Sequence, residues 1–323
     1  MPYRDAEATL DEAMDGVLAE RDVDLALVAV DDGSQDGGPE LVRERARSDT
    51  RIVQLETGGA GLVVALETGW RSVDAPFVAR MDADDVSVPG RIARASALLA
   101  ERPELGAVGT RAEAFPPELV GEGLAHYVAW QNAIVSPEDH AREIWVESPL
   151  CHPSVVMRRT ALESVGGYRE ERWAEDYDLW LRMHVSGFGL AKVPEVLLRW
   201  RHHARRATFA HARYELARFA ECKARYLAPL LLARAAPVVV WGAGQTGRRF
   251  ARALEAEGVR TSAFVDIDPR KIGRTARGAP IEPPSWLRAR TDATILVAVG
   301  ARGARALVRA QLDALSLPHV AVA

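Results

Sequence analysis

The sequence predicts an α/β protein: a larger N-terminal part built on an open, mostly parallel β-sheet, followed by a smaller α/β unit. Three observations carry this prediction. Short apolar runs alternate with amphipathic stretches over the first 110 residues, a pattern typical of strands joined by helices. Two of these runs end in clustered aspartates. A glycine turn follows another apolar run at residues 238–247, which predicts a second strand-turn-helix unit.

The N-terminal elements follow from periodicity and from turn residues. Four strands are predicted, at residues 25–30, 51–56, 76–81 and 105–110. Three helices are predicted between them, at residues 39–49, 61–73 and 88–104, the first beginning at Pro39. Strands that alternate with helices indicate a mostly parallel sheet covered on both faces. Further along, Tyr177, Trp180, Leu181 and His184 recur at helical spacing, and a helix is expected over residues 175–187.

The length of 323 residues favours two domains over one. An amphipathic helix over residues 212–236 separates the irregular middle of the chain from the strand "VVVW". We therefore predict a first domain at residues 1–203, a helical linker at 204–235 and a second domain at 236–323.

Charge and composition argue against several classes of protein. A net charge of -4, from 41 Lys+Arg and 45 Asp+Glu, gives no general attraction to nucleic acid or anionic membranes. No uncharged apolar run is long enough to span a bilayer, and the first residues lack the apolar core of a signal peptide. A cytoplasmic protein is expected, with attachment at a membrane surface left open. Cys151 and Cys222 lie too far apart to indicate a zinc site and are expected to be buried.

Carboxylates follow two predicted strands. Asp31 and Asp32 end one strand, and Asp82, Asp84 and Asp85 follow another. The carboxyl ends of parallel strands border the crevice in which such sheets bind ligands. Within "DADD", a hard divalent cation held by carboxylates and substrate phosphates would relieve the charge repulsion. The alternative is a metal-free turn in which Asp85 or Ser87 caps the next helix.

Three motifs taken together resemble a known family. "VDDGSQD", "ARMDADDVSVPGR" and "AEDYDLWLR" occur in this order over residues 1 to about 201, and this combination resembles the family 2 glycosyltransferases, inverting enzymes of GT-A fold. The resemblance implies that Asp31, with Asp32 beside it, meets the nucleotide base. It further implies that Asp82 lies near the ribose and that Asp84 holds Mn or Mg on the diphosphate. The implied partners are a UDP-, GDP- or dTDP-sugar and a saccharide, lipid-linked or protein acceptor.

Asp176 matches the general base of that family. Inverting transfer needs a carboxylate that takes the proton of the acceptor hydroxyl on the face opposite the leaving diphosphate. Glu175 precedes Asp176 and could exchange roles with it. The structural alternative is that Glu175, Asp176 and Asp178 are first-turn acids that favour the helix dipole.

Basic residues supply further candidates. His152 is a candidate on the acceptor side, although a histidine before proline in an apolar stretch is more often structural. The segment "RWRHHARR" at residues 199–206 resembles a family loop in which a histidine completes the metal shell or meets the diphosphate. His202 and His203 are both candidates there. Arg201 and its neighbouring arginines suit a diphosphate, and a solvated basic surface is the alternative.

The sequence also departs from the family. "MPYRDAEATL" supplies the end of the usual first motif but no apolar strand before it, so a GT-A sheet without its first strand is expected. An upstream start, or a truncated variant, would explain this. "TGGAGLVVALETGW" stands where the family has an asparagine-glycine turn and an arginine-asparagine pair, which puts sugar contacts from that helix in doubt.

The C-terminal unit supports a rival function. Gly242, Gly244 and Gly247 follow "VVVW", and Asp266 comes about 20 residues later, which matches the dinucleotide-binding fingerprint. An NAD-dependent oxidoreductase is therefore one alternative function, and an inactive or regulatory nucleotide-sugar binder is another. Too few residues follow Pro237 for a complete dehydrogenase. A Rossmann-like accessory domain, with a nucleotide as a possible ligand, is the preferred interpretation.

Overall fold

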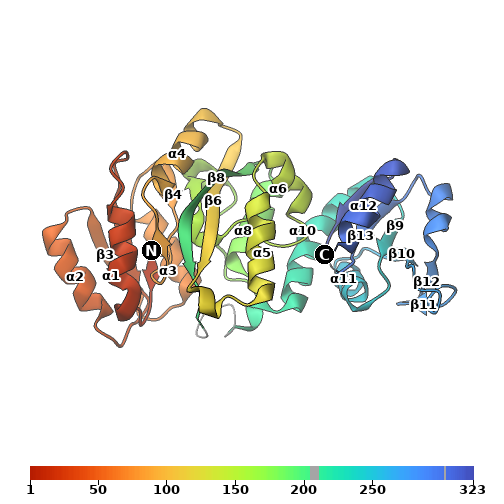
Figure 1. Ribbon diagram of the computed structural model, residues 1–323, viewed down its shortest axis with the longest axis horizontal. Helices are drawn as coiled ribbons and strands as arrows, with labels where there is room; N and C mark the ends of the chain where they lie inside the picture. Colours follow the sequence, from red (N-terminus) through yellow and green to blue (C-terminus); the bar gives the residue numbers. More distant parts are fainter. Residues whose placement is uncertain (204–210, 302) are drawn as a thin grey trace. The chain divides into compact units, whose positions relative to one another are not determined.

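The computed structural model describes residues 1–203, 211–301 and 303–323 (Figure 1). The chain divides into two compact units. The first holds Met1–Ala141, Ser148–Glu171 and the described part of Glu175–Ala210, and the second holds Arg142–Glu147, Arg172–Ala174 and His211–Ala323. The boundaries predicted at residues 203 and 236 stay predictions. Residues 204–210 of the predicted linker lie outside the described residues, and its helix α10 (Leu216–Arg234) groups with the second unit.

The first unit begins with a parallel sheet in the order β1-β2-β3. Its strands are β1 (Pro2–Tyr3), β2 (Leu27–Asp31) and β3 (Ile52–Glu56), joined through α1 (Glu7–Leu18) and α2 (Gly38–Ser48). Every residue of β2 is buried, as expected for a strand covered on both faces. Helix α3 (Leu62–Arg71) follows β3 and packs against β2.

Of the expected first strand the structure contains the end: the two-residue segment β1 pairs in parallel with β2. The N–H groups of Val30 and Asp32 donate to the carbonyl oxygens of Met1 and Tyr3, each at 2.9 Å. Buried backbone N–H groups need acceptors, and the residues around Pro2 provide them. The tyrosine side chain is also buried.

A second, mixed sheet has the order β4-β7-β6-β8-β5. Its strands are β4 (Phe77–Ala79), β5 (Val86–Ser87), β6 (Leu105–Phe115), β7 (Val156–Arg158) and β8 (Gly189–Arg201). The long strands β6 and β8 run parallel, and the other pairs are antiparallel. Helices of this part are α4 (Arg91–Glu101), α5 (Glu122–Ala133), α6 (Pro137–Glu143), α7 (Arg159–Ser164) and α8 (Glu175–Val185). All four strands predicted in the first 110 residues are present.

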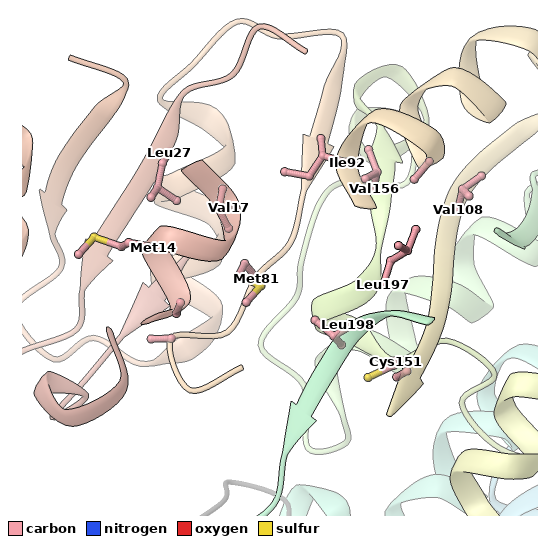
Figure 2. Packing of buried hydrophobic residues seen from close by; sticks show 14 of the residues in the cluster. Met14, Val17, Leu27, Met81, Ile92, Val108, Cys151, Val156, Leu197 and Leu198 are labelled. Carbon is pink, nitrogen blue, oxygen red and sulfur yellow. The ribbon is translucent and has the colours of Figure 1, made fainter. Parts of the chain in front are cut away.

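One hydrophobic core joins the two sheets of the first unit. Figure 2 shows Met14, Val17 and Leu27 from the side of the parallel sheet, and Ile92 and Val156 from the side of the mixed sheet. All of these side chains are buried. Burying apolar side chains from both sheets holds the two together, although no described strand pairs with both. The predicted burial of Cys151 and Cys222 is confirmed.

The second unit is built on a sheet in the order β11-β12-β10-β9-β13-β14. Its strands are β9 (Val238–Trp241), β10 (Thr261–Val265), β11 (Thr275–Ala276), β12 (Ala279–Glu282), β13 (Thr294–Val297) and β14 (His319–Ala321). All pairs are parallel except β11 with β12, and α11 (Gln245–Ala256) and α12 (Ala304–Ala314) are its other helices. The strand order reverses between β9 and β13, as in Rossmann-like folds. None of the described helices is long and apolar enough to cross a membrane.

Candidate functional site

Three carboxylates gather after β4. Asp82, Asp84 and Asp85 can each offer one oxygen, and these oxygens all lie within 4.8 Å of one another. Asp82 and Asp84 are partly exposed, whereas Asp85 is buried. Hard oxygen donors suit Mg²⁺ or Mn²⁺. Residues 82–85, which we call the acidic loop, therefore carry a donor set that fits a divalent cation.

The end of β8 brings basic residues to the acidic loop, because β5 pairs antiparallel with β8. His203 Nε2 lies 2.8 Å from Asp84 Oδ2. Arg201 donates through Nε to the backbone oxygen of Asp84 at 2.6 Å, and its guanidinium also pairs with Glu12. His202 donates its backbone N–H to the carbonyl oxygen of Phe115. Of the two candidate histidines, His203 is the one beside Asp84, and a ligand role for His202 stays a prediction.

The prediction that Asp85 or Ser87 caps the next helix is wrong. Helix α4 begins at Arg91 after Gly90, which has a φ of 90° and provides no side-chain cap. Asp85 Oδ1 accepts the backbone N–H of Arg201 at 2.6 Å, and Ser87 Oγ accepts Arg91 Nε–H at 2.7 Å. Residues 86–87 pair with β8 as strand β5, so helix α4 cannot begin directly after Asp85 and begins at Arg91 instead. Asp85 thus anchors the end of β8 to the acidic loop.

Arg80 connects the acidic loop to the interior. It forms an ion pair with Asp82 while its own side chain is 5% exposed. Burial, the largest single influence, would lower the pKa of Arg80, but the charge and hydrogen bond of Asp82, together with Tyr168 and Glu175, outweigh it and raise the pKa. The guanidinium therefore stays positive. It holds Asp82 at the carboxyl end of β4 and is close enough to Tyr168 and Glu175 to interact with them electrostatically.

Asp31 and Asp32 lie at the carboxyl end of β2, and both are 7% exposed. Asp31 Oδ1 accepts hydrogen bonds from the N–H and the hydroxyl of Ser34, at 3.0 and 2.5 Å. Asp32 Oδ1 accepts from the Thr57 hydroxyl at 2.8 Å and from Gly61 N–H at 2.9 Å. One oxygen of each carboxylate therefore stabilises, through hydrogen bonds, the loops that follow β2 and β3. The predicted contact of Asp31 and Asp32 with a nucleotide stays a prediction.

Helix α8 presents the candidate bases at its first two positions. Asp176 is partly exposed, whereas Glu175 is 3% exposed. Glu175 Oε1 lies 4.0 Å from His152 Nδ1, and His152 Nε2 lies 2.8 Å from the Tyr168 hydroxyl. Burial, together with the charge of Arg80, holds the pKa of His152 well below its usual range. His152 is thus a neutral, buried member of a polar cluster, which matches its structural alternative.

We expect Asp178→Ala to lower the free energy of unfolding by about 3–5 kcal/mol. Asp178 is fully buried and accepts Arg182 Nε–H at 2.7 Å, so the variant leaves a buried guanidinium without its counter-charge. Urea denaturation followed by tryptophan fluorescence measures the change. The control is Glu163→Ala, whose partner Arg159 lies 3.6 Å away and whose side chain is 50% exposed; it should cost less than about 1 kcal/mol. Equal costs for both variants would contradict the expectation.

The glycine turn of the second unit is closely packed. A Cβ atom on Gly247 would lie 1.8 Å from the backbone oxygen of Gly242, and one on Gly242 would lie 2.5 Å from that of Ala298. Gly244 has open space around it. Two of the three fingerprint glycines are thus required by the fold itself, and this close helix–strand approach is shared with dinucleotide sites.

Asp266 is tied to this turn. Its carboxylate accepts Ala243 N–H and Lys271 Nζ–H, each at 2.9 Å, and Asp268 N–H at 3.0 Å. Burial would raise the pKa of Asp266, but these hydrogen bonds outweigh it and lower the pKa. The contacts give Asp266 a structural role, and ligand binding by Gly242, Gly244, Gly247 and Asp266 stays a prediction.

Gly247→Ala should destabilise the second unit by about 2 kcal/mol or more, because the backbone must move to admit the methyl group. Gly244→Ala, in the same turn, should change stability by no more than about 0.5 kcal/mol. Thermal and chemical unfolding of the full chain measure both effects. A neutral Gly247→Ala would show that the close approach to Gly242 is dispensable.

The sequence alone did not reveal two residues of the site. Arg80 stands two positions before Asp82, and the alternation of an extended segment was the available signal. Tyr168 had no local signal, because only the fold places it against His152.

The N-terminal half of the chain is similar in sequence to known glycosyltransferases. A family model described as Glycosyl transferase family 2 matches residues 1–166. The amylovoran biosynthesis glycosyltransferase AmsE of Erwinia amylovora is 33% identical over 150 residues, which are 46% of this chain and 53% of that protein. An uncharacterized glycosyltransferase of Haemophilus influenzae is 30% identical over 138 residues, which are 43% of this chain and 49% of that protein. The chain thus spans about half the length of these relatives.

Two solved structures are similar in fold. The mannosyltransferase PcManGT of Pyrobaculum calidifontis, in complex with GDP-Man and Mn²⁺, has a TM-score of 0.50 at 20% identity, covering 79% of this chain and 67% of that one. S. aureus TarS in complex with UDP-GlcNAc has a TM-score of 0.56 at 16% identity, covering 72% of this chain and 65% of that one. At these identities the likeness concerns the fold.

Proposed function

Because the chain belongs to glycosyl transferase family 2 and has a GT-A fold, we propose that it transfers a sugar from a nucleotide-diphosphate sugar to an acceptor hydroxyl, with inversion. The acidic loop is the observation that carries this proposal. Its carboxylates lie within 4.8 Å of one another at the carboxyl end of β4, where such sheets bind ligands. The donor class is a UDP-, GDP- or dTDP-sugar, and a saccharide, lipid-linked or protein hydroxyl accepts the sugar.

Two solved structures of similar fold support this donor class. Their structures contain GDP-Man with Mn²⁺ in one case and UDP-GlcNAc in the other. In this chain Asp31, with Asp32 behind it, would meet the nucleotide base from the carboxyl end of β2. Its Oδ1 is occupied by Ser34, and the second oxygen remains as the acceptor for a base N–H.

Asp84 would hold a divalent cation, Mn²⁺ or Mg²⁺, with Asp82 beside it. When bound, such a cation neutralises the charge of the diphosphate leaving group. The protein's own part is to keep the carboxylates in place. Arg80 pairs with Asp82, Arg201 with the backbone of Asp84, and His203 with the Asp84 carboxylate. These contacts reduce the rearrangement needed on binding.

Asp176 is the proposed general base. It is partly exposed at the start of α8, so an acceptor hydroxyl can reach its carboxylate. Its Oδ1 accepts the N–H of Tyr177 at 2.7 Å, which orients the group. Glu175 is buried against His152 and therefore fits a positioning role better than proton transfer.

The proposal is tested by ligand-dependent melting followed by product analysis. With Mn²⁺ present, UDP, GDP or dTDP should raise the melting temperature of the full chain, and the matching nucleotide sugar should be consumed with an acceptor. Proton NMR of the product should report the opposite anomeric configuration to the donor. If no nucleoside diphosphate changes melting, the proposal fails. Binding without transfer would indicate a regulatory nucleotide-sugar binder, and a shift with NAD alone would indicate the oxidoreductase.

A further inference from the structure

Four buried polar side chains meet at the start of α8: Arg80, His152, Tyr168 and Glu175. They come from separate stretches of the first unit, since Arg80 follows β4, His152 begins the 3-10 helix η2 (His152–Ser154) and Tyr168 follows α7. We call these four residues the inner cluster. A buried polar group costs free energy unless it has a partner, so the partners of each member show what the cluster stabilises.

Helix α3 fixes the position of Tyr168. The backbone N–H of Tyr168 donates to Glu67 Oε1 at 2.5 Å, and the same oxygen accepts Trp70 Nε1–H at 2.7 Å. Gly167 has a φ of 67°, and a Cβ atom there would collide with the carboxylate of Glu67. Burial raises the pKa of Tyr168, so its hydroxyl keeps its proton. Tyr168 is therefore a rigidly placed hydrogen-bond donor.

His152 lies between Tyr168 and Glu175, at 2.8 Å from the hydroxyl through Nε2 and at 4.0 Å from Oε1 of Glu175 through Nδ1. The ring is neutral, so one nitrogen carries a hydrogen and the other accepts one. The other acceptor near the Tyr168 hydroxyl is Met157 Sδ at 3.8 Å, and a thioether is a weak acceptor. The hydroxyl therefore donates to Nε2. The hydrogen of His152 is then on Nδ1 and faces Glu175, whereas the other tautomer would turn a lone pair toward the carboxylate.

His152 also contacts the second turn of α8. Its ring meets the ring of Trp180 edge-on, with centroids 5.8 Å apart, and Trp180 is fully buried. Glu175 directly precedes Asp176, and Trp180 follows Asp176 by about one helical turn. The histidine therefore holds α8 on both sides of Asp176, whose own side chain stays partly exposed.

Arg80 joins the inner cluster to the acidic loop. Its guanidinium pairs with Asp82 and interacts electrostatically with Glu175. Its backbone is tied to η2 by the buried Arg91, whose Nη1 donates to Arg80 O at 3.2 Å and to Pro153 O at 3.0 Å. The acidic loop and the start of α8 thus share one buried support.

We propose that Tyr168 and His152 are positioning residues for the sugar transfer: the Tyr168 hydroxyl orients His152, whose Nδ1–H holds Glu175, and Glu175 fixes the direction of the neighbouring base. Both residues are buried and act through Glu175 rather than on a substrate. The inference rests on the proposed function. A displacement of a reacting group by about 1 Å can cost about 10²-fold in rate, so a rigid support beneath the base has a measurable effect on turnover.

Tyr168→Phe tests the inference, because it removes only the hydroxyl. It should lower kcat by about tenfold or more, while the KM for the donor and the Mn²⁺-dependent melting shift with nucleoside diphosphate should stay within about twofold of wild type. The control is Tyr127→Phe, whose hydroxyl donates to Ser148 O at 3.0 Å in the same unit; it should leave kcat unchanged. A folded Tyr168→Phe with wild-type kcat would overturn the inference.

A double-variant comparison tests whether Tyr168 acts through Glu175. If it does, adding Tyr168→Phe to Glu175→Gln should slow turnover by no more than about twofold beyond Glu175→Gln alone. Losses that multiply would show that the two residues act independently and would overturn the proposed order of contacts.

Nitrogen NMR of the histidine-labelled wild-type chain tests the same contacts without turnover. The resonances that disappear in His152→Asn should report a neutral ring protonated at Nδ1 from about pH 6 to pH 8. A ring protonated at Nε2, or a charged ring, would overturn the inference. A wild-type chain that transfers no sugar from any donor would overturn the proposed function, whereas an active wild type together with an equally active Tyr168→Phe would overturn this inference alone.

Discussion

Replacing Asp84 with asparagine is expected to reduce kcat/KM for sugar transfer by about 10³-fold, because a metal ligand at a developing phosphate charge contributes several kcal/mol. Asp84 is the partly exposed member of the acidic loop whose side chain contacts His203. The substitution keeps the shape of the side chain and removes its charge. The measurements are transfer rates across a Mn²⁺ titration and the Mn²⁺-dependent melting shift caused by the donor nucleotide, and both should fall.

Two further variants isolate this effect. Asp22→Asn removes an exposed carboxylate elsewhere in the first unit and should leave rate and Mn²⁺ dependence unchanged. His203→Gln should weaken apparent Mn²⁺ affinity by about tenfold or more, as the loss of a group that orients a metal ligand does. Wild-type Mn²⁺ dependence in Asp84→Asn would remove Asp84 from the cation site.

Asp176→Asn is expected to lower kcat by about 10²–10⁴-fold, because an amide cannot take the proton of the acceptor hydroxyl. Binding of the donor nucleotide should be unchanged, since Asp176 lies on α8 and the acidic loop follows β4. Melting shifts with Mn²⁺ and nucleoside diphosphate measure binding, and initial rates at saturating donor and acceptor measure kcat. The expected signature is a loss of turnover with retained nucleotide binding.

Glu175→Gln separates the two acids at the start of α8. Glu175 is buried beside His152, so this change should lower stability as well as rate. Glu163→Gln, at an exposed position before α8, serves as the control with no expected effect. If Asp176→Asn turns over within tenfold of wild type while a folded Glu175→Gln is inactive, the roles of the two acids are exchanged.

The order of strands and helices in the first unit was predictable, because it follows from local sequence patterns. The apolar residues from Leu25 to Val30 favour a strand that is buried on both faces, and Pro39 favours the start of a helix. The three acidic motifs could be related to one another only through the family resemblance, since their spacing along the chain does not determine their distance in space. The helix expected at residues 175–187 is present as α8.

Three features could be established only from the tertiary structure. Asp85 could not be distinguished from a helix cap, because its partner, the N–H of Arg201, is 116 residues away in sequence. The same strand pairing places His203, 119 residues from Asp84, beside it. The two residues of β1 could not be recognised as a strand end from the sequence, because so short a segment carries no strand pattern and is defined by its hydrogen bonds with β2.

The sequence by itself determined the α/β class, the positions of the carboxylates at strand ends, and the second unit with its glycine turn, because periodicity, turn residues and motif order are local properties. Only the tertiary structure decided which histidine meets Asp84, which acid of α8 is accessible, and that Asp85 anchors the end of β8. Each of these depends on pairing between distant segments. Such pairing is set by the packing and hydrogen bonding of the whole unit, so no short stretch of residues encodes it.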